Sequence, residues 1–163
     1  MALKIPNPSE KISKYFTWGE ALYLPSYNRM ATEADGLTQE MLDQLKVTFT
    51  WMDKVREYFG KAIKVHIAWR SVQYHQDLYK EINAKKRAKG QPEVRVPTKS
   101  AHLDGFAVDF SVQGISCDEA KQRILDDNKL EEWNLRMEDN GKGAGWVHLD
   151  SKKPGPSGRF FKP

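Results

Sequence analysis

One long amphipathic segment constrains the fold of this chain more than any other feature. Between residues 38 and 59, apolar side chains recur at steps of three and four and form a single stripe of Leu42, Leu45, Phe49, Met52, Val55 and Phe59. This spacing is that of an α-helix whose apolar face packs against a second layer of structure. Thr38 is suited to cap the helix start, and Gly60 stands where a helix commonly ends. The segment therefore predicts one long helix in the core.

The remaining segments combine strand and helix patterns. Strand patterns occur at about 64–69, 106–111, 135–139 and 146–150. Ser71 and Ser116 are suited to cap two further helices, the first of which ends at about Asn83. The glycine-rich residues 140–145 predict a hairpin turn between the last two strands. We therefore predict an α+β fold, with an antiparallel sheet and helices packed on one side of it.

Length and composition indicate a single domain. A chain of 163 residues is long enough to bury one sizeable core, which we expect within about residues 15–150. Residues 151–163 are rich in proline and glycine and predict a C-terminal loop. Cys117 is the single cysteine, which excludes an intramolecular disulfide and a cysteine-rich zinc site. No segment has the apolar character of a signal peptide or a membrane span, so we expect a soluble chain made in the cytoplasm.

Basic residues are concentrated in one window of the chain. Residues 80–99 hold seven Lys and Arg side chains against two Glu, while the whole chain carries a net charge of +4. Such a window attracts anionic polymers, although it is also typical of a solvated, flexible loop. The window contains no aromatic residue on which the bases of single-stranded nucleic acid would stack. We therefore rank a nucleic-acid-binding module last among the possible functions and expect no nucleic-acid partner.

Two histidines and one aspartate have the residue types and spacing of a zinc site. His102 and Asp109 supply a neutral imidazole and a carboxylate, which are good zinc ligands. Positions seven apart on a straight strand face opposite sides, but the pair Asp104-Gly105 offers a turn between them. The third ligand is His148, on the last predicted strand. Three protein ligands leave a fourth zinc position open, as catalytic zinc sites require.

The residues around these ligands resemble a known peptidase family. The pattern S-x-H-x-x-G-x-A-x-D is matched at five fixed positions by Ser100, His102, Gly105, Ala107 and Asp109. This motif is that of the zinc D-alanyl-D-alanine carboxypeptidase and L-alanyl-D-glutamate endopeptidase family, which is structurally related to the hedgehog signalling domain. Residues 146–150 resemble the second motif of the family, and Phe16, Trp18 and Glu20 resemble the opening signature of one branch. The similarity covers about residues 15–150.

The resemblance implies a fold, an activity and further site residues. It implies a hedgehog-like fold, one Zn²⁺ ion held by the two histidines and the aspartate, and hydrolysis of the stem peptide of bacterial peptidoglycan. It also implies an arginine after an early strand that binds the scissile carbonyl or the substrate, and Arg70 occupies that place. A fixed guanidinium suits the developing oxyanion of a tetrahedral intermediate. Ser100 resembles the family serine that contacts substrate.

The general base is left open by the sequence. Many family members have Glu or Asp three residues before the last histidine, but this chain has Gly145 there. Alternation along the predicted hairpin places Glu138 across from the metal strand, which makes it our first candidate for the base. Asp150 is the second candidate, because it shares a strand face with His148, and it is alternatively a partner that orients this histidine.

These observations together predict a function and its setting. A small, basic wall peptidase without a signal peptide resembles a phage endolysin, which is made in the cytoplasm of the bacterial host and reaches the wall after release. We expect a monomer whose partner is the peptidoglycan stem peptide, with either an endopeptidase or a carboxypeptidase activity. The alternative is a catalytically inactive, zinc-containing domain of the same fold that binds the cell wall, an alternative motivated by Gly145.

Overall fold

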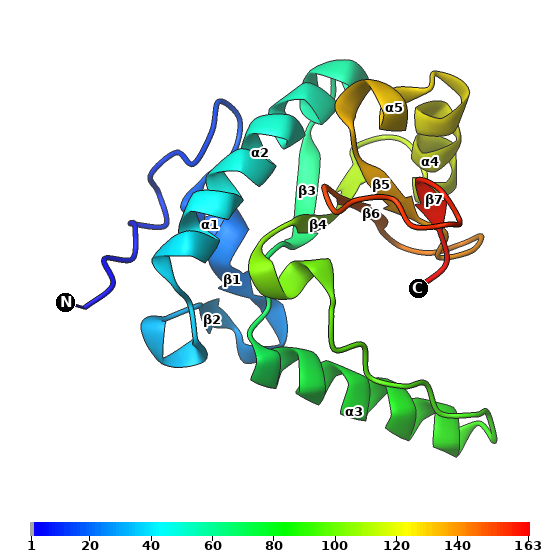
Figure 1. Cartoon of the computed structure of the whole chain (residues 1–163), viewed down its shortest axis with the longest axis horizontal. Helices are drawn as coiled ribbons and strands as arrows, with labels where there is room; N and C mark the ends of the chain where they lie inside the picture. The colour runs from blue at the N-terminus through cyan, green and yellow to red at the C-terminus, as the bar shows by residue number, and fades with distance from the viewer. Residues whose placement is uncertain (1) are drawn as a thin grey trace.

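The computed structural model describes residues 2–163 and has an α+β architecture in which helices and short strands are interspersed along the chain (Figure 1). The helices are α1 (Trp18–Leu22), α2 (Gln39–Phe59), α3 (Val72–Ala88), α4 (Cys117–Asp126) and α5 (Lys129–Trp133). Short 3-10 turns are η1 (Pro25–Tyr27), η2 (Glu33–Asp35) and η3 (Ala101–Asp104). The strands are β1 (Tyr23–Leu24), β2 (Arg29–Met30), β3 (Ile63–Ile67), β4 (Ala107–Val112), β5 (Arg136–Glu138), β6 (Val147–Asp150) and β7 (Phe160–Phe161).

The main sheet has five strands in the order β3-β4-β6-β5-β7. The β3-β4, β4-β6 and β6-β5 pairs are antiparallel, but β7 is parallel to β5. The predicted antiparallel sheet is therefore correct for the first four strands and wrong for the last pair. The prediction of a C-terminal loop over residues 151–163 is also wrong at Phe160–Phe161, because the backbone of β7 satisfies the free edge of β5. A two-residue strand after a segment rich in proline and glycine carries no periodic signal.

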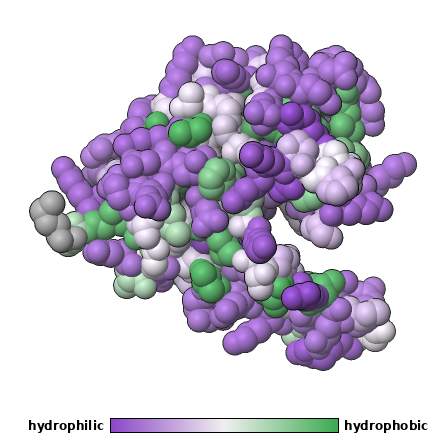
Figure 2. All heavy atoms as spheres, viewed as in Figure 1, coloured by the Kyte–Doolittle hydropathy of each residue, from purple (hydrophilic) through white to green (hydrophobic). Residues whose placement is uncertain are grey.

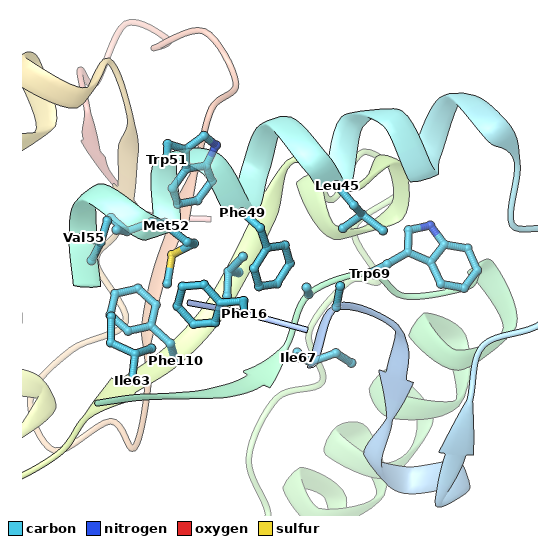
Figure 3. Close-up of a cluster of buried hydrophobic side chains, with 14 of the residues drawn as sticks. Phe16, Leu45, Phe49, Trp51, Met52, Val55, Ile63, Ile67, Trp69 and Phe110 are labelled. Carbon is cyan, nitrogen blue, oxygen red and sulfur yellow. The ribbon is translucent and has the colours of Figure 1, made fainter. Parts of the chain in front are cut away.

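Helix α2 covers one face of the sheet, as its apolar stripe predicts. The Thr38 side chain accepts a hydrogen bond from the backbone N–H of Met41, and Gly60 ends the helix in a left-handed conformation. Phe49 and Met52 are fully buried and lie between this helix and the sheet, where they meet Phe110 of β4 (Figure 3). The buried residues of α4, α5 and α1 belong to the same cluster. The prediction that helices pack on one side of the sheet is correct for α2, α4 and α5.

Helix α3 departs from the predicted arrangement in length and in position. Ser71 caps it as expected, but the helix continues to Ala88 instead of ending near Asn83, because the intervening Lys, Arg and Ala residues favour helix. Only Tyr74 and His75 of this helix are buried, so its later turns extend away from the body (Figure 1). Together with residues 89–100 it forms a projection that we call the arm. The arm is separated from the sheet by a hollow (Figure 2).

Helix α2, with 21 residues, is the longest helix within residues 2–163, and its buried side chains pack onto the sheet. None of the helices within residues 2–163 combines the length and the apolar character needed to cross a bilayer.

Candidate metal centre

The three predicted ligands converge on the face of the sheet opposite α2. His102 comes from η3, Asp109 from β4 and His148 from β6. Asp109 and His148 are direct partners in the β4-β6 ladder, which fixes their separation. One ligand atom of each residue lies within 4.8 Å of the other two, and all three residues are buried. The structure therefore brings together the residues that the sequence predicted as a metal group.

A turn at Gly105 brings His102 to the same face as Asp109. Gly105 adopts a left-handed conformation with φ of +84°, and its carbonyl accepts a 2.6 Å hydrogen bond from Thr48 of α2. A β-carbon at this position would lie 3.2 Å from both a Leu45 side-chain atom and the Met41 carbonyl. Glycine is required here because both the backbone conformation and the close approach to α2 disfavour a side chain. The predicted turn is thus present and is anchored on the long helix.

The hydrogen bonds of His102 assign its protons. Nδ1 lies 2.6 Å from the Ala68 carbonyl, which only accepts, so Nδ1 carries the hydrogen. Burial, together with the positive charge of Arg70, lowers the pKa of His102 to about 4 and keeps this imidazole neutral at ordinary pH. Nε2 therefore presents a lone pair, and it lies 3.1 Å from Oδ1 of Asp109. Two acceptor atoms at this distance repel each other unless a cation lies between them.

His148 is oriented by a second carboxylate in the same way. Its Nε2 donates to Oδ2 of Asp150 at 2.9 Å, and its Nδ1 lies 2.9 Å from Oδ1 of Asp109. Burial opposes protonation, but the hydrogen bonds and negative charges of the two carboxylates raise the pKa of His148 to about 9. A divalent cation competes for the position of this second proton. Asp150 therefore lies behind His148 and not in front of the metal group, so its geometry is that of the orienting partner.

The carboxylate of Asp109 has three polar neighbours: His102, His148 and Arg70. Its Oδ1 faces both imidazoles, while Oδ2 accepts a 3.2 Å hydrogen bond from Nη2 of Arg70. Burial acts to raise the pKa of this carboxyl, but the interactions with the two neighbouring imidazoles, of which His148 carries the charge, outweigh burial and hold the pKa well below its ordinary value. The carboxylate is therefore ionised, as a metal ligand must be.

The donor set fits zinc. Two imidazole nitrogens and one carboxylate oxygen match the ligands of catalytic zinc sites with three protein ligands. The second nitrogen of each imidazole is hydrogen-bonded to a carbonyl or a carboxylate, an arrangement that fixes the ring orientation in most metal-binding histidines. We conclude that His102, Asp109 and His148 form a group able to hold a divalent metal ion.

The first candidate for the general base lies beside this group. Glu138 on β5 places Oε2 3.8 Å from Nδ1 of His148, on the metal side of the ring. Burial raises the pKa of Glu138, which makes the carboxylate a better proton acceptor than an exposed one. Gly145 also lines the groove, and an added β-carbon there would meet nothing within 4 Å. The structure brings Glu138 into the position that the hairpin alternation predicted.

His102, Asp109 and His148 line a groove of about 1050 Å³ between the arm and the sheet. The arm lines one wall with Leu78, Ile82, Val94 and Val96, whereas charged residues of β4, β5 and β6 line the other. Ser100 lies in this groove beside His102, and Trp146 lines it, whereas Trp69 is buried in the core. All of the residues predicted for substrate binding therefore face one opening.

Two neighbours of the metal group, His75 and Arg136, were not identified from the sequence. His75 is buried, its Nε2 donates to the Pro97 carbonyl at 2.7 Å, and its Nδ1 lies 3.4 Å from Nη1 of Arg70. Arg136 forms a two-pronged ion pair with Asp150. Arg136 is two residues from Glu138, so strand alternation is a signal that could have placed both on one face, but no sequence pattern links His75 to Arg70.

His66 is the remaining histidine of the chain, and it lies in the groove without reaching the metal group. Its Nε2 is 3.0 Å from the Ser111 hydroxyl. His66 is therefore hydrogen-bonded between neighbouring strands and is not part of the metal group.

Comparisons of this chain with protein-family models, curated proteins and solved structures found no match. The site is therefore interpreted from its own geometry and from the motif resemblance described above.

Proposed function

We propose that this protein is a zinc peptidase that hydrolyses a peptide bond in the stem peptide of bacterial peptidoglycan. The observation that carries the proposal is the orientation of the two imidazoles. Each of them donates a hydrogen bond backward to an internal acceptor and points its other nitrogen at the Asp109 carboxylate. A cation in that position satisfies three acceptors at once. The cell-wall substrate is supported by the resemblance of the motifs at 100–109 and 146–150.

The roles of the side chains follow from their positions. Zinc, when bound, would polarise the scissile carbonyl and activate the attacking water. Glu138 would accept the proton of that water and later deliver it to the leaving amine, because its carboxylate faces the metal side of His148. Arg70 would donate to the developing oxyanion, since its guanidinium has five N–H donors and, within residues 2–163, hydrogen-bonds only to Asp109 and His75. Ser100 would contact the substrate at the mouth of the groove.

The biological setting belongs to the same proposal. The protein would act as a lysis enzyme of a bacteriophage, made in the bacterial host and acting on the wall after release. The bond is either the L-alanyl-D-glutamate link or the terminal D-alanyl-D-alanine link, since both hydrolyses use the same kind of zinc site.

The direct test of the proposal is mass spectrometry of purified peptidoglycan after incubation with the protein. We expect soluble products that depend on zinc and disappear with a chelator. Glycan carrying only L-alanine would identify the endopeptidase, and stems shortened at their end would identify the carboxypeptidase. Unchanged peptidoglycan in the presence of a zinc-loaded, folded protein would contradict the proposal.

Replacing the candidate base separates chemistry from metal binding. We expect Glu138→Gln to retain zinc while kcat/KM falls by about 10²- to 10⁴-fold, the usual contribution of a positioned general base. Glu131→Gln is the matched control, because Glu131 is exposed on α5 and is not among the residues that line the groove. Full activity of Glu138→Gln would show that another group is the general base.

A second candidate function is a zinc-containing domain that binds the cell wall without cutting it. The observation that favours it is Gly145, which leaves open space where many family members carry an acidic residue. This candidate predicts that the zinc-loaded protein sediments with insoluble peptidoglycan and releases no fragments.

A further inference from the structure

The C-terminal strand closes the edge of the strand that supports the metal centre. The N–H of Met137 donates to the Arg159 carbonyl at 2.7 Å, and the N–H of Asp139 donates to the Phe161 carbonyl at 2.6 Å. On its other edge, β5 pairs with β6 (Figure 1). Strand β5 is therefore held from both sides, and it carries Arg136 and Glu138 toward the groove. The position of these two side chains depends on residues at the very end of the chain.

Arg136 connects β5 to the partner of a metal ligand. Its Nε donates to Oδ1 of Asp150 at 2.8 Å, and its Nη2 donates to Oδ2 at 3.1 Å. The Asp150 side chain is completely buried, and Oδ2 also accepts the 2.9 Å hydrogen bond from His148. A buried carboxylate needs a paired cation to remain ionised, and the two-pronged guanidinium supplies it. Arg136 thereby fixes the acceptor against which His148 is oriented.

Phe161 fixes Arg136 in turn. The guanidinium lies 4.0 Å from the centre of the Phe161 ring, within the range of a cation–π contact. The same ring meets the imidazole of His148 edge-on, with ring centres 6.1 Å apart. Arg136 thus lies between an aromatic face and the Asp150 carboxylate, and its side chain is only 19% exposed. The contacts run without a break from Phe161 through Arg136 and Asp150 to His148.

We propose that the C-terminal strand is a working part of the metal centre, in which Phe161 and Arg136 are positioning residues that hold Asp150 against His148. The ligand nitrogen of His148 then points at Asp109 because the opposite side of the ring is fixed. This inference rests on the metal centre of the proposed function, but not on the peptidase activity. Partners behind a metal ligand commonly change metal affinity by about 10- to 100-fold when they are removed.

The test is the Zn²⁺ affinity of the whole 163-residue chain, measured by competition with a chromophoric chelator. We expect Arg136→Met to bind zinc about 10- to 100-fold more weakly than the wild type. Phe161→Ala removes one contact further from the metal, and we expect a loss of up to about fivefold, as for an ordinary cation–π contact. Phe160→Ala is the matched control, because the adjacent ring is 38% exposed and lies on the other face of β7. Within residues 2–163, the cation–π contact with Arg136 and the edge-on aromatic contact with His148 are made by Phe161 and not by Phe160. The control variant should bind zinc as the wild type does.

Two further measurements separate positioning from a loss of folding. The visible absorption of the Co²⁺-substituted protein reports the ligand geometry directly, and we expect it to change in Arg136→Met and to be partly restored in Arg136→Lys, which keeps the charge. Thermal unfolding of the metal-free variants reports stability alone. Unchanged zinc affinity in both Arg136→Met and Phe161→Ala would overturn the inference, as would an equal loss in Phe160→Ala and Phe161→Ala.

The outcomes distinguish this inference from the proposed function. A wild-type protein that binds zinc and loses affinity in Arg136→Met, but releases no wall fragments, supports the role of the C-terminal strand and contradicts the peptidase. Wild-type affinity in the variants together with full peptidase activity contradicts the C-terminal role alone. A wild-type protein that binds no zinc overturns both.

Discussion

Arg70 connects the arm to the metal group, because its guanidinium contacts both His75 of the arm and the ligand Asp109. It donates to Asp109 at 3.2 Å and approaches His75 at 3.4 Å, while His75 is tied to the Pro97 carbonyl of the arm. The guanidinium is therefore fixed in the groove by partners on both sides. This geometry suits a donor that must be in place before the oxyanion develops.

A lysine at this position keeps the charge but not the fork of donors. We expect Arg70→Lys to lower kcat by about 100-fold or more, which is the usual effect of removing one preorganised oxyanion donor. Zinc content should be unchanged, because Arg70 contacts a ligand residue without being one. The measurement is steady-state kinetics on a soluble wall fragment, with Arg87→Lys on the exposed arm as control. A wild-type kcat in Arg70→Lys would show that Arg70 is not the oxyanion donor.

Gly105 is the residue whose conformation makes the site possible. An alanine there combines a left-handed backbone with a β-carbon 3.2 Å from atoms of α2. We expect Gly105→Ala to lower the free energy of unfolding by about 1–3 kcal/mol. Gly114→Ala is the control, because Gly114 has a similar φ of +80° but open space around it. Urea unfolding of the two variants separates backbone strain from the clash, and equal losses would show that the contact with α2 contributes nothing.

The ligands and the orienting partner Asp150 were accessible to sequence reasoning, whereas the other side chains that support them were not. His102, Asp109 and His148 have the residue types that bind zinc, and a short turn between the first two is visible in the chain. His75 and Phe161 gain their roles only from contacts with residues that are distant in sequence, such as Arg70 and Arg136. No local pattern encodes such contacts, so the structure was needed to find them.

At the scale of elements, the ion pair between Arg29 and Asp35 of η2 contributes to the stability of the fold. Asp35 accepts hydrogen bonds from Arg29 at 2.7 Å and caps its own turn through Thr32. The hydrogen bonds from Arg29, set against burial, lower the pKa of Asp35 to about 2 from the ordinary value of 3.8. The folded state therefore binds this proton more weakly than the unfolded state does. The stabilisation is present above pH 3.8 and is lost as the pH falls through about 2.

This contribution is measurable by mutation at two pH values. We expect Asp35→Asn to lower the free energy of unfolding by about 1 kcal/mol at pH 7, a value reduced for the solvent exposure of Arg29. The difference from the wild type should shrink between pH 4 and pH 2, and Arg29→Met should reproduce the same pattern. A difference that stays constant over this range would mean that the charge of Asp35 is not involved.

Elements with a strong periodic pattern were predicted well, and elements defined by their partners were not. The stripe from Leu42 to Phe59 specifies α2 because six apolar residues share one face. Strand β7 is specified by the unpaired edge of β5, which its own two residues do not reveal. The length of α3 was underestimated because its last turns have helix-forming residues without an apolar stripe.

At the scale of the whole molecule, the two faces of the main sheet have different roles. One face packs against α2, α4 and α5 and forms the core, and the other presents the metal group to the groove. The alternation of β4 makes this possible, since Val108 and Phe110 point into the core while Ala107 and Asp109 point the other way. The α+β class followed from the sequence. The groove did not, because its second wall is an arm whose position no local pattern predicts.

The metal content of the purified chain tests the central claim most directly. After dialysis against zinc and removal of free metal, elemental analysis should find one zinc ion per wild-type chain. Asp109→Ala and His148→Ala should retain little or none, whereas His66→Ala should retain the full amount, because His66 lies in the groove but outside the metal group. A wild-type protein without zinc, or ligand variants that hold as much zinc as the wild type, would contradict the account.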